Sequence, residues 1–334
     1  MESVNRTLFN LAMAIQFIFI FCLFSSANRY VSINKIENMC YFLDCQLSNQ
    51  LAVKAGEGLG IKDSKQHPKI AFLFLVVDKV NNPQVWDTFF QNADARKYSV
   101  YFHSKNKDVD SLNFRSVNQH IHIETIPTEW GGIGLWLAMS SLLNNSFVDQ
   151  GNQRFVFLSQ ACIPLYSFNE LYEMLLRQGN SMIEIPQSGD GIFPRYNYLR
   201  RYAREDQILK HCQWLILNRI HTGMLVQEHE RAKRFLLEEI EYGTPNVYFQ
   251  DEAVIGTMLY KLGQRNMITH QCVTYTKWDP PTSASPIQYQ RVDKTLVQTA
   301  RVGGCLFLRK VGPDAEIIDD YLQLIRNRKS ITNS

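Results

Sequence analysis

The stretch at residues 154–165, Arg-Phe-Val-Phe-Leu-Ser-Gln-Ala-Cys-Ile-Pro-Leu, is the part of the chain that decides the fold. Its apolar run at residues 155–158 lacks polar alternation, as in a strand that is covered on both faces. Small and polar residues follow, and Pro164 cannot donate a hydrogen bond to a neighbouring strand. Buried central strands of open α/β sheets end in such loops, where ligands bind. The stretch therefore predicts an α/β fold with a ligand site at this strand end.

Apolar runs and amphipathic segments alternate on both sides of this strand. Residues 69–77 are an unbroken apolar run and predict a first buried strand, and residues 83–95 have apolar residues at helical spacing. Strands that alternate with helices indicate a mostly parallel sheet with flanking helices. The polar stretch at residues 279–298 is expected to be a loop. Further strands are predicted at residues 99–103, 121–126, 213–217, 272–276 and 304–309, and further helices at residues 132–143, 169–177, 225–242, 252–262 and 315–326.

The N-terminal segment at residues 8–27 is apolar and contains no charged residue. A membrane-spanning helix needs about 20 such residues. We therefore predict a cytoplasmic tail at residues 1–7, a transmembrane signal anchor at 8–27, a polar stem at 28–66 and a lumenal domain at 67–334. The alternative is a signal peptide cleaved after Ser25-Ser26-Ala27. Either interpretation places the rest of the chain in the secretory lumen.

Charge and cysteine content limit the partners and the compartment. The formal net charge of +3 is mild, and no basic block alternates with aromatic residues, so nucleic acid is not an expected partner. Six of the seven cysteines follow the apolar segment, an even number that permits disulfides in an oxidising compartment, although their pairing stays open. No Cys-x-x-Cys or His-x-x-x-His spacing indicates a zinc site.

Three motifs occur in a fixed order along the chain: Trp130-Gly131-Gly132, the Leu-Ser-x-x-Cys-Ile-Pro-Leu of residues 158–165, and Asp251-Glu252. Together they resemble the Core-2/I-branching β-1,6-N-acetylglucosaminyltransferases, especially the plant-type members, which are related to peptide O-xylosyltransferases. The resemblance covers roughly residues 69–310. It implies a GT-A-like nucleotide-sugar-binding fold in a single-pass type II Golgi membrane protein with a lumenal catalytic domain.

The resemblance also implies the reaction. A sugar would be transferred from a UDP donor to a hydroxyl of a glycan or glycoprotein, with inversion at the anomeric carbon and formation of a β linkage. The first candidate for that sugar is N-acetylglucosamine. One alternative is a catalytically silent member of the family that binds glycans or partners another transferase. Another is a metal-dependent transferase that uses Asp108 and Asp110.

The end of the central strand carries no carboxylate. Many GT-A enzymes hold a divalent metal there through an Asp-x-Asp motif, whereas this strand ends in Ser159-Gln160-Ala161-Cys162. The Asp-x-Asp at residues 108–110 lies in a polar stretch, where a solvated loop is its expected role. The resemblance implies instead that Arg301, Arg309 and Lys310 bind the diphosphate, so no metal cofactor is expected. From spacing alone, these residues on both sides of a short apolar strand would be merely solvated.

Glu252 is the candidate catalytic base. A carboxylate at a helix start most often only complements the helix dipole. In the family, however, a glutamate at such a helix start takes the proton of the acceptor hydroxyl, and Glu252 matches that position.

The remaining candidate contacts rest mainly on the resemblance, and core packing is the alternative for the apolar and aromatic ones. Some members carry an aspartate near the uridine ribose where this chain has Ser104, and a Gly-Ser pair where it has His211-Cys212. These departures leave the donor sugar open. The candidates are Trp130, Gln213, Trp214 and Val77 for the donor and Arg195 and Tyr196 for the acceptor.

Overall fold

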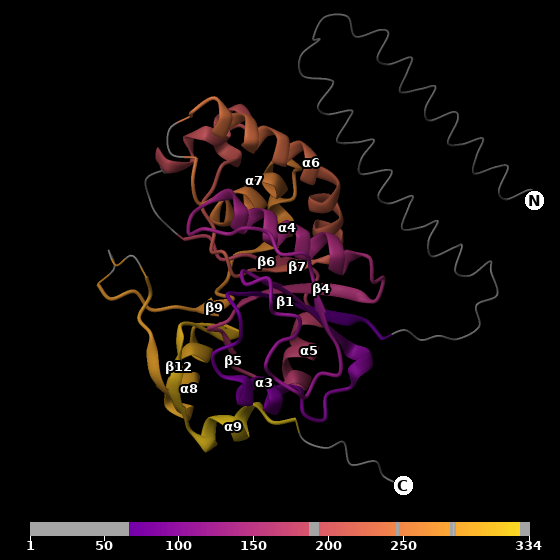
Figure 1. The fold of residues 1–334 in the computed structure, drawn as a ribbon, viewed down its shortest axis with the longest axis vertical. Helices are drawn as coiled ribbons and strands as arrows, with labels where there is room; N and C mark the ends of the chain where they lie inside the picture. The colour runs from indigo at the N-terminus through magenta and orange to yellow at the C-terminus, as the bar shows by residue number, and fades with distance from the viewer. Residues whose placement is uncertain (1–66, 187–193, 245–246, 281–282, 284, 328–334) are drawn as a thin grey trace, which may run out of the picture. The chain divides into compact units, whose positions relative to one another are not determined.

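The computed structural model describes residues 67–186, 194–244, 247–280, 283 and 285–327, and Figure 1 shows how they are arranged. The predicted tail, anchor and stem at residues 1–66 lie outside them. Within the described ranges, no helix combines the length and the apolar character that a membrane crossing requires.

A seven-stranded sheet forms the centre of the domain, in the order β3-β2-β1-β4-β7-β6-β8. The four strands from β3 to β4 run parallel, and β7 is antiparallel to both β4 and β6. The predicted α/β class with a mostly parallel sheet is confirmed. The strands are β1 (Lys69–Val76), β2 (Tyr98–Ser104), β3 (His120–His122), β4 (Asn152–Ser159), β6 (Ser181–Met182), β7 (Ile216–Asn218) and β8 (Ile268–Thr269).

Helices cover both faces of this sheet, as the uninterrupted apolar strands require (Figure 1). Successive side chains of β1 point to opposite faces, so Phe72 and Phe74 enter one core and Leu73 and Leu75 the other. The first core lies against α3 (Pro83–Phe90) and α5 (Phe168–Arg177), and the second against α4 (Ile133–Phe147), α6 (Arg219–Glu241) and α7 (Val254–Lys261). Short 3-10 turns connect these elements: η1 (Ala95–Lys97), η2 (Pro194–Arg201), η3 (Glu205–Gln207), η4 (Gln250–Glu252) and η5 (Arg265–Met267).

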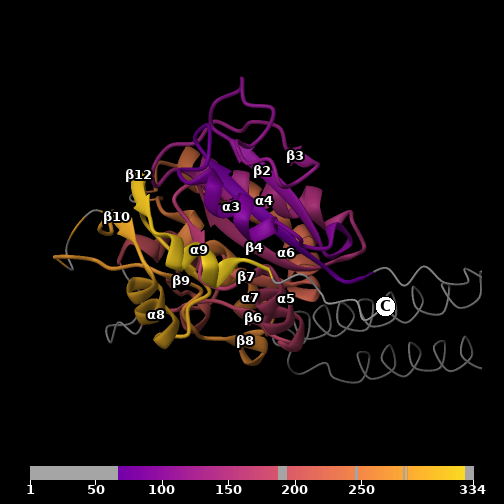
Figure 2. The same ribbon diagram turned by 90° about the horizontal axis from the view of Figure 1, so that it is seen from below.

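The C-terminal elements lie together beside α3 in both views (Figures 1 and 2). Here two predictions are wrong. The expected loop at 279–298 contains a strand and the start of a helix, which Asp293 caps by accepting a hydrogen bond from the Leu296 N–H at 3.0 Å. The predicted last helix begins late because a strand runs through Gly312 and Pro313. These elements are β9 (Thr274–Tyr275), β10 (Tyr289–Val292), β11 (Phe307–Leu308), β12 (Val311–Ile317), α8 (Lys294–Val302) and α9 (Asp319–Ile325). The strand β5 (Ile163–Pro164), which follows β4 in the chain, pairs with β11.

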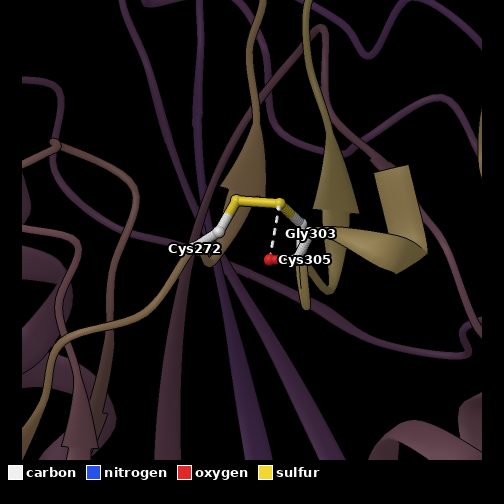
Figure 3. Close-up of a disulfide and its surroundings, with 3 residues drawn as sticks. All are labelled: Cys272, Gly303 and Cys305. Atoms are coloured by element: carbon white, nitrogen blue, oxygen red, sulfur yellow. Dashed lines mark hydrogen bonds between the residues drawn. A yellow bond between two sulfur atoms is a disulfide. The ribbon is translucent and has the colours of Figure 1, made fainter. Parts of the chain in front are cut away.

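A disulfide joins Cys272 to Cys305 (Figure 3) and supplies the pairing that the sequence left open. Cys272 precedes β9 and Cys305 precedes β11, and these two strands pair in parallel. Cys162 and Cys212 are free thiols. The disulfide therefore anchors β11, the strand that leads directly into Arg309.

Candidate active site

The order of the sheet changes direction between β1 and β4, since β2 and β3 lie on one side of β1 and β4 on the other. Ligands of open α/β sheets bind at such a switch point. The Val77 N–H, just past β1, donates to Oε1 of Gln160, just past β4, at 2.6 Å. Val77 is 50% exposed, so the alternative that it packs in the core is wrong. Ser104 is buried, and its hydroxyl donates to the Val77 carbonyl oxygen at 2.8 Å.

The guanidinium of Arg309 occupies the carboxyl end of β4. Its Nε donates to Oγ of Ser159 at 3.2 Å, and its Cζ lies 5.2 Å from the ring centre of Trp214. Burial lowers the pKa of Arg309, and the charges of Cys162 and Glu252 oppose that change. A cation thus stands at the strand end where Asp-x-Asp enzymes carry carboxylates. Trp214 is buried, and its ring contacts this cation.

The three predicted phosphate-binding residues do not all come together. Lys310 follows Arg309, and its carbonyl oxygen accepts a hydrogen bond from the Tyr289 N–H at 2.8 Å. Arg301 instead lies in the last turn of α8, where its Nε donates to the Leu165 carbonyl oxygen at 2.7 Å.

Strand register separates Arg301 from Arg309. Leu165 pairs with Leu306 at one end of the β5–β11 ladder, and Cys162, beside Arg309, lies at the other end. The three-residue step from Cys162 to Leu165 spans about 10 Å in an extended chain, so the two arginines contact opposite ends of this ladder. The interpretation that Arg301 and Arg309 flank one strand is therefore wrong, because Arg301 belongs to a helix.

Glu252 ends η4 and is separated from α7 by Ala253, so it does not lie inside the helix that the sequence predicts to begin there. Its Oε2 accepts a hydrogen bond from Nζ of Lys210 at 3.0 Å, and its side chain is 29% exposed. Asp251 is buried, and burial, with the charge of Glu252 adding to it, raises the pKa of Asp251 to about 7. Glu252 is thus the accessible member of the pair.

The turn before Glu252 is joined to the Trp130-Gly131 motif. Phe249 has left-handed backbone angles, φ 60° and ψ 40°, and its N–H donates to the Gly131 carbonyl oxygen at 2.8 Å. The Phe249 carbonyl oxygen in turn accepts from the Glu252 N–H at 3.0 Å. The Trp130 ring contacts the Phe249 ring edge-on, with centroids 5.1 Å apart, and Trp130 is 78% exposed. The alternative that Trp130 is a core residue is wrong.

The two predicted acceptor residues differ in position. Arg195 is exposed, with its Cζ 5.1 Å from the centre of the Phe249 ring. Tyr196 is fully buried, and burial, together with the charge of Glu252, raises its pKa. Tyr196 therefore lies beside Glu252 as part of the core and presents no surface to an acceptor. Gln213, predicted to reach the donor, is half-buried next to Trp214.

Two charged residues of this region were missed by the sequence analysis, Lys210 beside Glu252 and Glu184 beside Cys212. Lys210 forms the ion pair described above. Burial and the charge of Glu184 raise the pKa of the Cys212 thiol, and burial raises the pKa of Glu184 itself, which a hydrogen bond with Cys212 opposes. Lys210 and Cys212 flank His211. Because His211-Cys212 replaces the Gly-Ser pair of the family, this difference in sequence could have drawn attention to Lys210. Nothing in the sequence points to Glu184.

Carboxylates do not gather into a metal site in the described parts of the chain, where no three His, Cys, Asp or Glu residues are grouped suitably. Asp108 and Asp110 are exposed in the loop after β2, and the Asp108 N–H donates to Oδ1 of Asn106 at 3.1 Å. This is the solvated loop that the sequence predicts.

The sequence profile of the Core-2/I-branching enzymes matches residues 70–301. The chain belongs to this family. Membership confirms the predicted family. Among Core-2/I-branching relatives, glycosyltransferase BC10 of Oryza sativa subsp. japonica is 26% identical over 265 aligned positions, and the match covers 68% of this chain. The match covers 63% of BC10, so the chain spans less than two thirds of that relative.

Three solved glycosyltransferase structures match parts of the chain at low sequence identity. The bifunctional enzyme WbbM has a TM-score of 0.38 and 12% identity over 80% of this Core-2/I-branching chain and 51% of its own. The galactosyltransferase LgtC with donor and acceptor sugar analogues has a TM-score of 0.35 and 9% identity over 62% of this chain and 75% of its own. Mouse xyloside xylosyltransferase 1 has a TM-score of 0.34 and 8% identity over 64% and 92%, respectively.

Proposed function

We propose that this protein is an inverting, metal-independent transferase that moves a sugar from a UDP donor to a hydroxyl of a glycan or glycoprotein and forms a β linkage. N-acetylglucosamine is the proposed sugar, because it is the one that the family resemblance implies. The observation that carries the proposal is the placing of one accessible carboxylate, Glu252, close enough to Arg309 for its charge to act on the guanidinium.

In the proposed mechanism, Glu252 takes the proton of the acceptor hydroxyl while the acceptor oxygen attacks the anomeric carbon. The bond to UDP breaks on the opposite face, which inverts the configuration. Negative charge then develops on the β-phosphate, and Arg309 with Lys310 stabilises it. The Ser159 hydroxyl and the Trp214 ring hold the Arg309 guanidinium in place for this task.

The surroundings of the Asp251 and Glu252 carboxyl groups differ, and this difference suits the two groups to different roles. Burial raises the pKa of Asp251 to about 7, so Asp251 keeps its proton for longer as pH rises. Adjacent carboxyl groups whose environments differ in this way are suited to different roles. Glu252, accessible and paired with Lys210, is the one proposed to act as base.

The silent alternative is favoured by the same ion pair, because a lysine 3.0 Å from the carboxylate competes with an acceptor hydroxyl for it. Release of UDP from UDP-GlcNAc, UDP-xylose and UDP-glucuronate in EDTA distinguishes the two. We expect turnover with one of these donors, and Glu252→Gln to lower it by about 10²–10⁴-fold, the usual contribution of a general base. Glu241→Gln, at an exposed glutamate ending α6, is the control and should keep full activity.

The outcomes separate the proposals. UDP binding without turnover, unchanged in Glu252→Gln, supports the silent alternative. Turnover that EDTA abolishes and Mn²⁺ restores contradicts metal independence, and its loss in Asp108→Asn would then assign the metal to the loop after β2.

We also propose that the chain is a type II Golgi membrane protein with residues 67–334 in the lumen. The Cys272–Cys305 disulfide supports an oxidising compartment. Protease treatment of intact microsomes should leave the catalytic domain uncut. Digestion of that domain without detergent would contradict this topology.

A further inference from the structure

A cavity of about 330 Å³ lies at the end of the central strand opposite the candidate active site. Arg154 lines it near the start of β4, whereas Ser159, the partner of Arg309, ends that strand. Five extended residues span about 16 Å, so the two sites are separate. No aspartate or glutamate of the described residues lines the cavity. Its lining includes Arg154, Arg219 and the apolar residues Pro68, Leu176 and Ile220.

Arg154 is a buried cation. It is 6% exposed, and burial lowers the pKa of its guanidinium. Its Nη1 donates to the carbonyl oxygens of Gly179 at 3.4 Å and Asn180 at 3.1 Å, just past α5. Within the described ranges, its Nε and Nη2 have no hydrogen-bond partner, and no carboxylate forms an ion pair with it. A buried charge without a countercharge costs free energy, and an anion bound beside it would remove much of that cost.

The groups around Arg154 add to its positive charge. Arg219 lines the same cavity, and the carboxylate that acts on Arg219, that of Asp149, is already paired with Lys69 at 2.8 Å. Three cations and one carboxylate leave a net charge of +2. Burial, with the charge of Arg154 adding to it, lowers the pKa of the nearby His221 to about 4, so His221 is neutral at pH 7.

The long helix α6 begins at this cavity. Its N-cap Asn218 and its first two residues, Arg219 and Ile220, all line the cavity. The Asn218 side chain accepts the His221 N–H at 2.7 Å, whereas the N–H groups of Arg219 and Ile220 have no partner within the helix. A helix N-terminus carries about half a positive charge and binds phosphate through such N–H groups. The helix start and the guanidinium groups therefore favour the same kind of ligand.

We propose that this cavity is a second anion-binding site and that it binds an organic phosphate monoester. A net charge of +2 matches a phosphate dianion better than a single carboxylate, and guanidinium groups bind phosphate oxygens through paired N–H donors. A phosphate group alone fills only part of the cavity, and Leu176, Ile220 and Pro68 supply an apolar wall for the organic group. The inference does not depend on the proposed transferase function, whose donor binds at Arg309.

Titration calorimetry on the full-length protein tests the site. An ionic strength of about 0.15 M screens exposed charges far more than buried ones. The probes are inorganic phosphate, phenyl phosphate, glucose 6-phosphate and a short-chain phosphatidic acid. The last two distinguish a soluble sugar phosphate from a lipid headgroup as the source of the monoester. We expect phenyl phosphate to bind with a Kd of about 1 mM or lower, and inorganic phosphate to bind more weakly because it lacks the organic group.

Ile220 offers a matched pair of variants that leave both arginines in place. It is 52% exposed, so neither replacement should lower the Tm. Ile220→Glu adds a carboxylate to the cavity and should raise the Kd of phenyl phosphate about 10-fold or more, because like charges placed together oppose binding. Ile220→Gln has nearly the same size without the charge and should raise this Kd much less. Arg154→Lys should raise it as well, but Arg154 also binds two carbonyl oxygens of the fold, so the Ile220 pair is decisive.

Equal Kd values in the two Ile220 variants, or no binding of any monoester to the wild type, would overturn the inference. Inorganic phosphate that binds as tightly as phenyl phosphate would contradict the organic group. Excess UDP should leave the Kd of phenyl phosphate unchanged. Displacement by UDP, with binding unchanged in Ile220→Glu, would assign the monoester to Arg309 and overturn the second site.

Discussion

Gly131 holds the turn that carries the candidate base, and replacing it with alanine tests this arrangement. Its φ is +71°, a left-handed conformation that costs an L-residue with a side chain roughly 1–2 kcal/mol. An added Cβ would also lie 3.0 Å from Cε1 of Phe249, closer than an ordinary van der Waals contact. Alanine restricts the unfolded chain and returns about 0.4–1 kcal/mol. We therefore expect Gly131→Ala to lower the free energy of unfolding by about 1–2 kcal/mol once the contact is included.

Gly132 is a matched control one residue away. Its φ of −84° and ψ of 161° are extended, and a Cβ there would meet nothing closer than the Glu129 carbonyl oxygen at 3.5 Å. As the N-cap of α4 it stands where glycine is preferred over alanine, so alanine should lose roughly 0.5–1 kcal/mol there, which the restricted unfolded chain offsets.

Thermal unfolding and turnover measure the two effects. Gly131→Ala should lower the Tm by roughly 2–8 °C, and Gly132→Ala by less than about 2 °C. The shift of Phe249 should pass to Glu252 through the hydrogen bond between them and lower kcat by about 10-fold or more, because small misplacements of a base are costly. Equal Tm and kcat in the two variants would refute the reasoning, since Gly131 would then not be held in the left-handed conformation.

Three further predictions follow from single contacts. The double variant Cys272→Ala/Cys305→Ala removes a cross-link between residues 33 apart in the chain, so its free energy of unfolding in urea should be about 3–4 kcal/mol lower. A reducing agent should destabilise only the wild type. Arg309→Lys removes the planar guanidinium and should raise the Kd of UDP, measured by calorimetry, about 10-fold. Arg301→Met should change this Kd less than about twofold. Equal effects of the two substitutions would show that Arg301 also binds the diphosphate. The raised pKa of Asp251, about 7, means that the folded state binds its proton more tightly than the unfolded state. Stability should therefore fall as pH rises from about 4 to 7, and Asp251→Asn should flatten that slope; parallel slopes would show that Asp251 titrates normally.

Much of the fold follows from local pattern. The runs that became β1 and β4 are apolar at every position because both faces are covered, and that property is visible in a single sequence. The C-terminal elements were less predictable. The strand β12 contains Gly312 and Pro313, and α8 is signalled chiefly by its cap Asp293, so local propensity opposes or hides both elements.

The candidate site was predictable only in part. The motifs led to Glu252, Arg309 and Trp130, and the structure brings Glu252 near both of the others. The placing of Arg301 and Tyr196 was wrong, because helix membership and burial depend on packing between distant segments. Lys210 and Glu184 were missed for the same reason: each is an ordinary charged residue until the fold brings it to Glu252 and Cys212.

The sequence by itself determined the layered α/β architecture, the family, and the absence of a carboxylate at the end of the central strand, because each depends on residue types along a continuous segment. Only the tertiary structure decided that Arg309 lies at the end of the central strand and that Cys272 pairs with Cys305. It also decided that Trp130 contacts Phe249, in the turn that precedes Glu252. These are contacts between segments far apart in the chain. They form only when the whole core is packed, so no local pattern encodes them.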